Sequence, residues 1–410
     1  MWKDQEVAEI YDREVARQKR VLRMIPSENI MSEAVRAALG GVFCNKYAEG
    51  YPSKRYYQGQ ENNDAIERLA QARACALFGA EHANVQSYSG SPANMAAYMA
   101  VCEPGDRIMG LGLNSGGHLT HGWKVNFSGK LYEPHRIEVE ESTERLNYDQ
   151  IADMAREVKP KVLFIGTTSY SRVLDFARFR AIADEVGAYL VTDIAHVAGL
   201  VVAGAYPSPV PYADIVTMTS HKTLRGPRGG MILCRENLAQ AVDRAVFPGI
   251  QGGPHMNQVM ALAVALGEAA RPSFKAYGQQ VVKNAQCLAE HLTRMGLRIV
   301  SGGTDCHMMV VDLRAKNVDG KTAATALEKS GIVCNFNAIP YDPNPPRRPS
   351  GIRLGTPCLT SRGFKEAEMG KVAEWIVGIL DAPDDEEKQA RTAAEIEAFL
   401  KDYPVCPVID

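Results

Sequence analysis

The sequence of 410 residues lacks any apolar run of the ~20 residues that a membrane-spanning helix needs. Its charges nearly balance, with 46 Lys and Arg against 48 Asp and Glu, so no charge excess points to nucleic acid or an anionic membrane. The N-terminus, MWKDQEVAEIYDREVARQKR, has none of the apolar centre that signal peptides carry. We therefore expect a cytoplasmic protein that binds neither nucleic acid nor membranes.

The cysteines lack a pattern that would make them structural. There are nine, an odd number, and none form the CxxC spacing of zinc or redox sites. We therefore expect reduced thiols and no metal site. Hydrophobic residues make up 46% and charged residues 23%, as in ordinary globular proteins, and the length suffices for two domains with a large buried core.

From residue 61 onward, short apolar runs rich in β-branched residues alternate with helical stretches. This alternation predicts an α/β fold, with a mostly parallel sheet covered by helices on both faces. We expect strands at residues 83–86, 107–110, 161–166, 189–193, 214–218 and 231–234. Helices are expected between most of them, for example at residues 62–78, 148–157 and 176–186.

The segments outside this pattern suggest the domain organisation. An amphipathic helix at residues 4–24 is expected to pack on a partner subunit or on its own domain, and the loop-rich stretch 26–60 is too aromatic for disorder. Residues 255–296 predict a long helix joining two domains, followed by a strand at 308–313 and helices at 362–380 and 387–401. The predicted domains are an N-terminal arm and interface loop (1–60), a large domain (61–270) and a small α+β domain (271–410).

Polar residues follow three predicted strands, at the edge where open parallel sheets bind ligands. Ser89-Gly90-Ser91 precedes a helix and could hold a phosphate on the helix dipole, or merely cap that helix. Asp193 could pair with a protonated ring nitrogen, or cap a loop. Lys222 could form a Schiff base, or lie in a surface turn. A phosphate cradle, a carboxylate and a lysine in this order are what pyridoxal phosphate requires.

Two further residues are weaker candidates. His118 lies in the Gly-rich loop NSGGHLTHG, where its imidazole could stack on a planar ring, although a lone loop histidine carries little information. Arg353, in SGIRLGTP of the small domain, could bind a substrate carboxylate through two parallel hydrogen bonds.

Taken together, the motifs resemble those of the serine (glycine) hydroxymethyltransferases, which are fold-type I pyridoxal phosphate enzymes. The resemblance extends from about residue 5 to residue 380. It rests on SEN (27–29), NKYAEGYPSKRYY (45–57), NVQSYSGSPAN (84–94), GGHLTHG (116–122), DIAHVAGLV (193–201), HKTLRGPRGG (221–230), FPGIQGGP (247–254) and SGIRLGTP (350–357). It implies that the large domain binds pyridoxal phosphate.

The resemblance also implies roles for residues around the cofactor. Lys222 would hold pyridoxal 5′-phosphate covalently, His118 would stack on its ring and Asp193 would pair with the ring nitrogen. Ser89, Gly90, Ser91 and His221 would hold the phosphate, with Gly253 from a second subunit. The remaining expected cofactor or catalytic positions are Thr168, His196 and Thr219.

For the substrates, the resemblance implies reversible transfer of the hydroxymethyl group of L-serine to tetrahydrofolate, giving glycine and 5,10-methylenetetrahydrofolate. Arg353 would bind the amino-acid carboxylate, with Ser27 nearby. Tyr47, Glu49 and Tyr57 would reach in from a partner subunit, with Glu49 handling a proton, so the active form would be a homodimer or a tetramer of two dimers. The residues expected to face the folate are Leu113, Gly117, Leu119 and Asn337.

Several positions depart from the family pattern. Thr168 replaces a usual serine, and the other departures are Trp123-Lys124, Phe336, Tyr341 and Arg347-Arg348-Pro349. One interpretation is drift in loops. The alternative is an α-methylserine hydroxymethyltransferase or aldolase with altered or absent folate dependence. A non-catalytic homologue would be expected to lack Lys222, Asp193 or Arg353, and all three are present.

Overall fold

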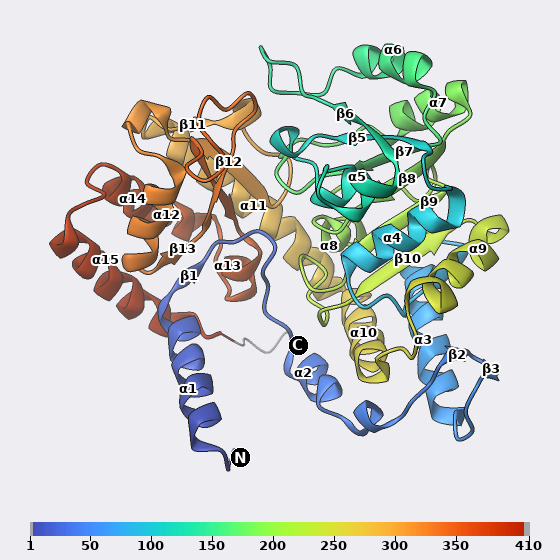
Figure 1. Cartoon of the computed structure of the whole chain (residues 1–410). Coiled ribbons are helices and arrows are strands. Elements are labelled where there is room, and N and C mark those ends of the chain that lie inside the picture. The colour runs from blue at the N-terminus through green and yellow to red at the C-terminus, as the bar shows by residue number, and fades with distance from the viewer. Residues whose placement is uncertain (1–2, 406–410) are drawn as a thin grey trace. The chain divides into compact units, whose positions relative to one another are not determined.

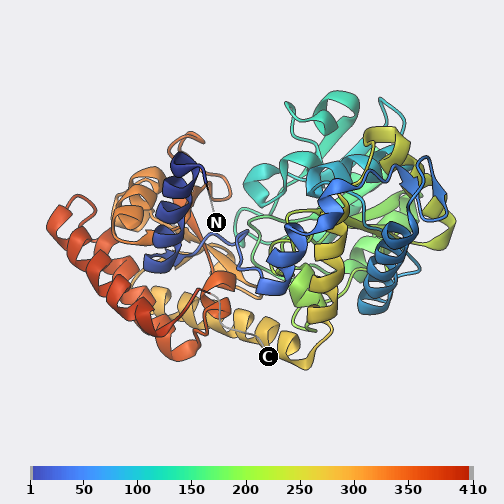
Figure 2. The same ribbon diagram turned by 90° about the horizontal axis from the view of Figure 1, so that it is seen from below.

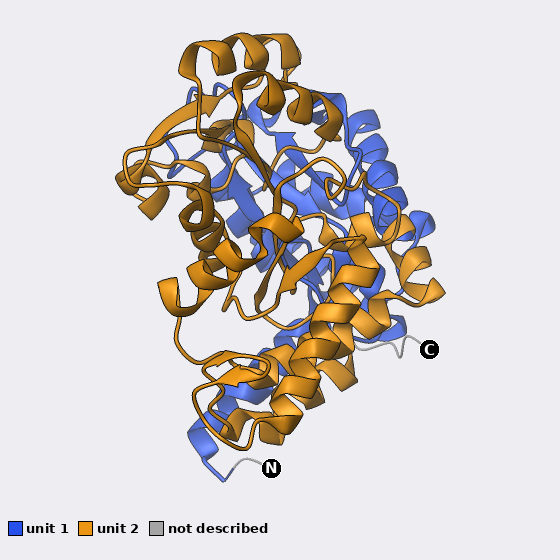
Figure 3. Cartoon of the chain, turned by 90° about the vertical axis from the view of Figure 1, so that its right-hand side faces the viewer, with its two compact units in different colours: residues 1–30, 280–410 blue, residues 31–279 orange. Residues whose placement is uncertain are grey.

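The computed structural model of the protein, shown in Figure 1, describes residues 3–405. Its contacts divide the chain into unit 1, residues 1–30 with 280–410, and unit 2, residues 31–279, coloured separately in Figure 3. The predicted boundaries at residues 60 and 270 concern folding domains rather than these two units, and they stay a prediction. The outermost ends of the predicted domains, residues 1–2 and 406–410, lie outside the described residues.

Unit 2 is organised on a seven-stranded sheet. The strand order is β4-β10-β9-β8-β7-β5-β6. Their bounds are β4 (His82–Asn84), β5 (Arg107–Leu111), β6 (Glu133–Ile137), β7 (Val162–Gly166), β8 (Tyr189–Asp193), β9 (Ile215–Thr219) and β10 (Gly230–Cys234). All neighbours are parallel except those of β10, which runs antiparallel to both β9 and β4. The predicted mostly parallel sheet is confirmed.

The burial of the central strands explains their sequences. Every position of β7 (VLFIG) and of β9 (IVTMT) is buried, so neither strand shows the apolar–polar alternation of a half-exposed sheet. The edge strand β6 was missed in the sequence, because EPHRI has three polar residues and a proline among its five positions and is buried only at Ile137.

Helices cover this sheet and extend unit 2. They are α2 (Glu33–Leu39), α3 (Glu61–Phe78), α4 (Gly90–Val101), α5 (Phe127–Leu131), α6 (Tyr148–Val158), α7 (Phe176–Val186), α8 (Ala198–Val202), α9 (Ala239–Arg244) and α10 (Met256–Ala269). Small residues of α4 pack on the sheet around Tyr98, which is fully buried. Helix α10 packs against α2 and α3, as Figure 2 also shows. These contacts hold residues 31–78 on the rest of unit 2.

Unit 1 contains a smaller antiparallel sheet of order β11-β12-β15-β14. Its strands are β11 (Arg298–Ile299), β12 (Met308–Asp312), β14 (Asn335–Asn337) and β15 (Gly351–Gly355), while β1 (Leu22–Arg23) pairs in parallel with β13 (Ile332–Val333). The helices that lie wholly in unit 1 include α1 (Gln5–Arg20), α12 (Gly320–Lys329), α13 (Pro357–Ser361), α14 (Glu366–Leu380) and α15 (Glu386–Phe399). Helix α1 buries none of its residues within the chain.

Two predicted helices have different bounds in the structure. The stretch 255–296 forms α10 and then α11 (Pro272–Arg294), because Pro272 lacks the N–H that would continue α10 and disfavours a helical residue before it. The stretch 362–380 begins as α14 only at Glu366, after Gly363 with φ +97°. No helix within residues 3–405 is both long and apolar enough to cross a membrane.

Candidate active site

Six of the seven strands of the sheet in unit 2, all except β10, end at the same edge. Strands β5, β7, β8 and β9 are mutually parallel, and β4 shares their direction because both β4 and β9 oppose β10. The segments that leave these carboxyl ends carry predicted site residues: Ser89, His118, Thr168, Asp193 and Lys222. The topology therefore brings these residues to one edge of the sheet.

Asp193, at the end of β8, is held by three donors. Its Oδ1 accepts a hydrogen bond from the backbone N–H of Ala195 at 2.8 Å. Its Oδ2 accepts from Nδ2 of Asn94 at 2.8 Å and lies 3.2 Å from Nε2 of His121. Burial alone would raise the pKa of Asp193, but the hydrogen bonds from His121 and Asn94 hold that pKa below its usual value. The carboxylate therefore stays ionised although it is almost buried.

The tautomer of His121 follows from its contacts. Its Nδ1 accepts a hydrogen bond from the backbone N–H of His118 at 3.2 Å, which leaves the proton of a neutral ring on Nε2, facing Asp193. Neither His121 nor Asn94 was expected from the sequence. Their positions in the motifs could have indicated them. His121 lies three residues after His118 in HLTHG, and Asn94 is the last residue of SGSPAN.

The ring of His118 is fixed in a neutral state. Its Nδ1 lies 2.7 Å from Oγ1 of Thr120, and that hydroxyl in turn accepts from Nδ2 of Asn94 at 2.8 Å. Nδ1 of His118 also accepts from the backbone N–H of Thr120 at 3.3 Å, so this nitrogen carries no proton and the Thr120 hydroxyl donates to it. Burial, with the charge of Lys222, lowers the pKa of His118 to about 4. A neutral, oriented imidazole is suited to stacking on a flat ring.

Lys222 lies in a closed turn that follows β9. The turn is closed by Ser220, whose N–H donates to the carbonyl of Gly229 at 3.1 Å and whose carbonyl accepts from Gly226 at 2.7 Å. The carbonyl of Lys222 accepts from the N–H of Arg225 at 3.1 Å. Local backbone geometry thus fixes where the Lys222 side chain starts, as a lysine that forms a covalent bond requires.

His221, next to Lys222, supplies a test of whether a polar ligand fits here. Its Nδ1 is buried and has no hydrogen-bond partner among the described residues. Burial, then the charges of Arg228 and Lys222, lower the pKa of His221 to about 3, so the ring is neutral. An unpaired buried polar group costs ~1–3 kcal/mol. The unpaired Nδ1 therefore favours a bound polar group at this position.

The turn from β4 into α4 passes very close to β9 and β10. A Cβ atom on Gly90 would lie 2.6 Å from Cγ2 of Thr219, and one on Gly230 would lie 2.4 Å from the carbonyl oxygen of Ser89. Ser89 precedes α4 but its side chain makes no capping hydrogen bond. The hydroxyl and the first N–H groups of α4 therefore suit a phosphate. Thr219 itself is buried and donates to the carbonyl of Ala195 at 3.3 Å.

The other residues predicted for this edge lie in two loops. Thr168 donates to the carbonyls of Gly116 and Gly117, from its N–H and hydroxyl respectively, at 2.7 and 3.2 Å. His196 is buried, and its carbonyl accepts from Oγ1 of Thr223 at 2.9 Å. The loop that carries Gly117 also carries Leu113 and Leu119, of which Leu119 is exposed.

A second group of predicted residues gathers around the hairpin of β2 (Gly50–Tyr51) and β3 (Lys54–Arg55). The rings of Tyr47 and Tyr57 meet edge to face, with centroids 5.2 Å apart. A Cβ on Gly253 would lie 2.9 Å from Cζ of Tyr47. Desolvation, followed by the charge of Glu49, raises the pKa of Tyr57. Tyr47, Glu49, Tyr57 and Gly253 therefore form one cluster.

A third group lies in unit 1. Arg353, in β15, donates from Nε to Oδ1 of Asn335 in β14 at 3.1 Å, and burial lowers its pKa to about 10. Ser27 follows Pro26, which packs so closely on β15 that a Cβ on Gly355 would lie 2.6 Å from Cα of Pro26. Asn337 lies on β14 and donates to the carbonyl of Ala338 at 2.6 Å.

Within residues 3–405 we find no group of three or more His, Cys, Asp or Glu residues arranged to hold a metal ion. The cysteines in this range form no disulfide bond.

Comparison with known proteins gives a consistent result. Residues 1–376 match the family model described as serine hydroxymethyltransferase. A protein named serine hydroxymethyltransferase from Sorangium cellulosum is 53% identical over 401 residues, which cover 98% of this chain and 95% of the relative. Another of that name, from Acidobacterium capsulatum, is 55% identical over 402 residues, covering 98% and 94%. This chain therefore belongs to the serine hydroxymethyltransferase family.

Proposed function

We propose that this chain is a pyridoxal phosphate-dependent transferase that moves the hydroxymethyl group of L-serine to tetrahydrofolate, reversibly, giving glycine and 5,10-methylenetetrahydrofolate. The observation that carries the proposal is the ionised, nearly buried Asp193, at the same sheet edge as the turn of Lys222. The near full-length similarity to proteins named serine hydroxymethyltransferase supports it.

The residues at the edge of the sheet fit pyridoxal phosphate as the cofactor. Asp193 supplies the negative charge that a protonated ring nitrogen needs, and His118 supplies a neutral ring for stacking. The unpaired Nδ1 of His221 and the start of α4 suit the phosphate, and Lys222 the covalent bond. When bound, the cofactor supplies an electron sink that lets the bond between Cα and Cβ of serine break.

In this proposal the protein itself binds, orients and moves protons. Arg353 binds the serine carboxylate through its planar guanidinium, with Ser27 beside it. Glu49 exchanges a proton with the serine hydroxyl as the one-carbon unit leaves at the oxidation level of formaldehyde. Leu113, Gly117, Leu119 and Asn337 contact the folate that takes up this unit.

The α-methylserine alternative is disfavoured. Both relatives described above carry the name serine hydroxymethyltransferase at more than half identity over nearly the whole chain. Two of the departures that suggested the alternative, Phe336 and Tyr341, are 42% and 51% exposed. Tyr341 lies in a loop, where exposed positions change readily without a change in activity, whereas Phe336 lies on the edge strand β14. The two departures therefore agree with drift at exposed positions.

We further propose that the protein acts in the cytoplasm as a homodimer, in which Tyr47, Glu49, Tyr57 and Gly253 complete the site of the partner. Tyr47, Tyr56 and Tyr57 support this, because they are 56%, 70% and 44% exposed in the single chain. Large exposed aromatic groups that lie together are typical of interfaces.

The proposal is tested by the visible absorbance of the purified holoenzyme with glycine or D-alanine, each with and without tetrahydrofolate. We expect a new band that rises strongly only when glycine and tetrahydrofolate are present together. Consumption of serine should match the formation of glycine and 5,10-methylenetetrahydrofolate. A band that needs D-alanine instead and ignores folate would overturn the proposal in favour of an α-methylserine substrate.

A further inference from the structure

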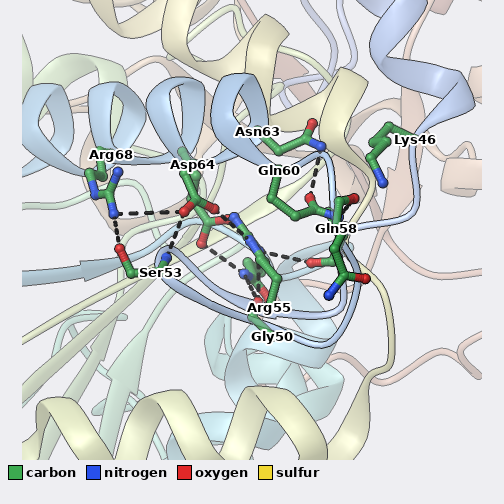
Figure 4. Close-up of polar contacts among 12 residues, drawn as sticks. Lys46, Gly50, Ser53, Arg55, Gln58, Gln60, Asn63, Asp64 and Arg68 are labelled. Atoms are coloured by element: carbon green, nitrogen blue, oxygen red, sulfur yellow. Dashed lines mark hydrogen bonds and ion pairs between the residues drawn. The ribbon is translucent and has the colours of Figure 1, made fainter.

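A buried ion pair joins the hairpin to α3. Nη2 of Arg55, in β3, lies 2.5 Å from Oε2 of Glu67, and the two side chains are 2% and 0% exposed. Nε of Arg55 also lies 3.0 Å from Oδ1 of Asp64, one turn earlier in α3. Figure 4 shows Arg55 facing Asp64, with Gly50 next to it. One guanidinium therefore contacts two carboxylates of the same helix.

The remaining contacts of Arg55 go to the backbone around Glu49. Its Nη1 donates to the carbonyl of Ala48 at 2.8 Å and to that of Gly50 at 2.7 Å. These carbonyls belong to the residues immediately before and after Glu49. The single Arg55 side chain therefore fixes the backbone on both sides of the proposed proton-transfer residue.

Gln86, which follows β4, extends the same arrangement. Its Nε2 donates to the carbonyl of Gly50 at 3.0 Å and to Oε1 of Glu67 at 2.7 Å. Glu67 thus accepts from both Arg55 and Gln86. The hairpin is thereby tied to α3 and to the sheet that carries Asp193.

The hairpin needs such anchors because it is too short to hold its own shape. Its strands have two residues each, and two-stranded hairpins are marginal in water. Stability alone does not explain a buried ion pair, because apolar residues of similar volume often do as well or better. A guanidinium with four defined contacts does, however, specify one geometry. Positioning is therefore the better explanation of the Arg55–Glu67 pair.

We propose that Arg55 and Glu67 are positioning residues for Glu49. They hold the Ala48–Gly50 backbone so that the Glu49 carboxylate, with Tyr47 and Tyr57 beside it, is presented in one orientation to the reacting serine hydroxyl. Neither residue contacts substrate or cofactor in this proposal. The inference rests on the proposed function for the role of Glu49, but the anchoring itself does not.

Hydrogen exchange in the holoenzyme tests the anchoring without reference to activity. The variants are Glu67→Gln, which removes the carboxylate charge at nearly constant size, and Arg55→Lys, which keeps the positive charge but loses the planar guanidinium with its several N–H donors. The backbone N–H of Tyr56 donates to the carbonyl of Glu49 at 3.1 Å, within the hairpin. We expect it to exchange about 10-fold faster in both variants, while amides of α4 keep their rates. Unchanged exchange over residues 47–57 would overturn the proposal.

Arg68→Gln is the matched control. Arg68 lies one residue after Glu67 and 3.7 Å from Asp64, but its side chain is 53% exposed. Figure 4 shows it directed at Ser53, in the turn between β2 and β3. Arg68 donates from Nη2 to Oγ of Ser53, so we expect this variant to keep the wild-type exchange of the Tyr56 N–H and the wild-type kcat. A loss in Arg68→Gln equal to that in Glu67→Gln would mean that no specific buried anchor exists.

A double-mutant cycle with Glu49→Gln tests the route of action. Glu67→Gln should lower kcat about 10- to 100-fold, with the serine KM and the absorbance of bound cofactor retained, because misplacing a catalytic group slows the chemical step. In the Glu49→Gln background it should have no further effect. Effects that multiply would refute action through Glu49. If the wild type transfers no hydroxymethyl group, the proposed function fails, while the exchange data still decide the anchoring.

Discussion

Two nearly buried carboxylates of unit 2 are supported in opposite ways. Asp193 is held by an amide of Asn94, a backbone N–H and His121, and its pKa is lowered. Glu67 is paired with the permanent charge of Arg55, and burial raises its pKa against the opposing effect of that charge. A carboxylate held mainly by hydrogen-bond donors keeps its negative charge for a further partner. The negative charge of a carboxylate paired with arginine is already balanced by the guanidinium. Asp193 is therefore suited to a ligand and Glu67 to the framework.

The same contrast separates two buried arginines. Arg55 contacts the carboxylates of Asp64 and Glu67. Arg353, in unit 1, donates from Nε to the neutral amide of Asn335, and burial lowers its pKa. The amide of Asn335 orients the Arg353 guanidinium, whose planar fork matches a carboxylate. The kind of partner is thus a way to distinguish groups that orient the protein from groups proposed to bind a substrate.

The largest effect that distinguishes the two carboxylates is expected from Asp193→Asn. The amide has nearly the same size, so the fold should persist, but it cannot keep a ring nitrogen protonated. We expect kcat to fall by about 10²- to 10³-fold, a typical result of removing one electrostatic contact at a reacting centre. Steady-state kinetics with serine and tetrahydrofolate measure the change, and the visible absorbance of the cofactor monitors its binding.

Glu67→Gln provides the comparison for this variant. If Glu67 belongs to the framework, its loss in kcat should be smaller than that of Asp193→Asn, and the cofactor absorbance should keep its wavelength. Equal losses with equal spectral changes in the two variants would contradict the distinction between them.

Much of the architecture of unit 2 could be predicted from the sequence. Runs such as VLFIG and IVTMT are apolar or β-branched because both faces of those strands are buried, so the strands and their order along the chain were readable. Residues at strand ends, such as Ser89, Asp193 and Lys222, then fall at one edge by topology alone. The break at Pro272 was also readable, and the expected single helix was wrong.

The partners of the site residues could not be predicted in this way. Asn94 and His121 reach Asp193 across 99 and 72 residues of sequence, and such contacts depend on the packing of α4 and the loop after β5. The same holds for Arg55, which looks like a surface residue in the polar stretch YPSKRYY but is buried against α3. β1 likewise pairs with β13, a strand far away in the sequence. Local sequence patterns do not predict these long-range contacts.

A smaller effect should follow from changing the residue that orients Arg353. The amide of Asn335 is itself fixed, because its Nδ2 donates to the carbonyl of Phe336 at 2.8 Å. Asn335→Ala removes the acceptor of Nε, and we expect the serine KM to rise about 10-fold with little change in kcat, as for a lost hydrogen bond to a charged group. Asn335→Asp should raise KM further, because a carboxylate beside Arg353 would compete with that of the substrate. An unchanged KM in both variants would show that Asn335 does not orient Arg353 for binding.

The smallest effect concerns a second anchor of the hairpin, and it should depend on pH. The hydroxyl of Tyr51 donates to the carbonyl of Asp243 at 2.7 Å, and Nε2 of His82 lies 3.0 Å from Oδ1 of the same Asp243. The hydrogen bond to Asp243 raises the pKa of His82 against the opposing effect of burial. The pair therefore stabilises the fold fully below the unfolded pKa of about 6.5, and this contribution is lost as pH rises through the higher folded pKa.

His82→Gln should accordingly lower the melting temperature more in acid than in base. The pair is partly exposed, at 21% and 25%, so we expect at most about 1 kcal/mol at pH values below about 6, falling toward zero as the pH rises through the raised pKa of folded His82. Thermal unfolding at both pH values measures the difference, with His135→Gln, in a pair with Glu133 that is more exposed, as the control. Because Asp243 holds Tyr51 through its backbone carbonyl and His82 through its side chain, kcat should change little in this variant. A large loss of kcat would mean that the hairpin depends on the His82–Asp243 pair as much as on Arg55. The buried Arg55–Glu67 pair would then have no special role in positioning the hairpin.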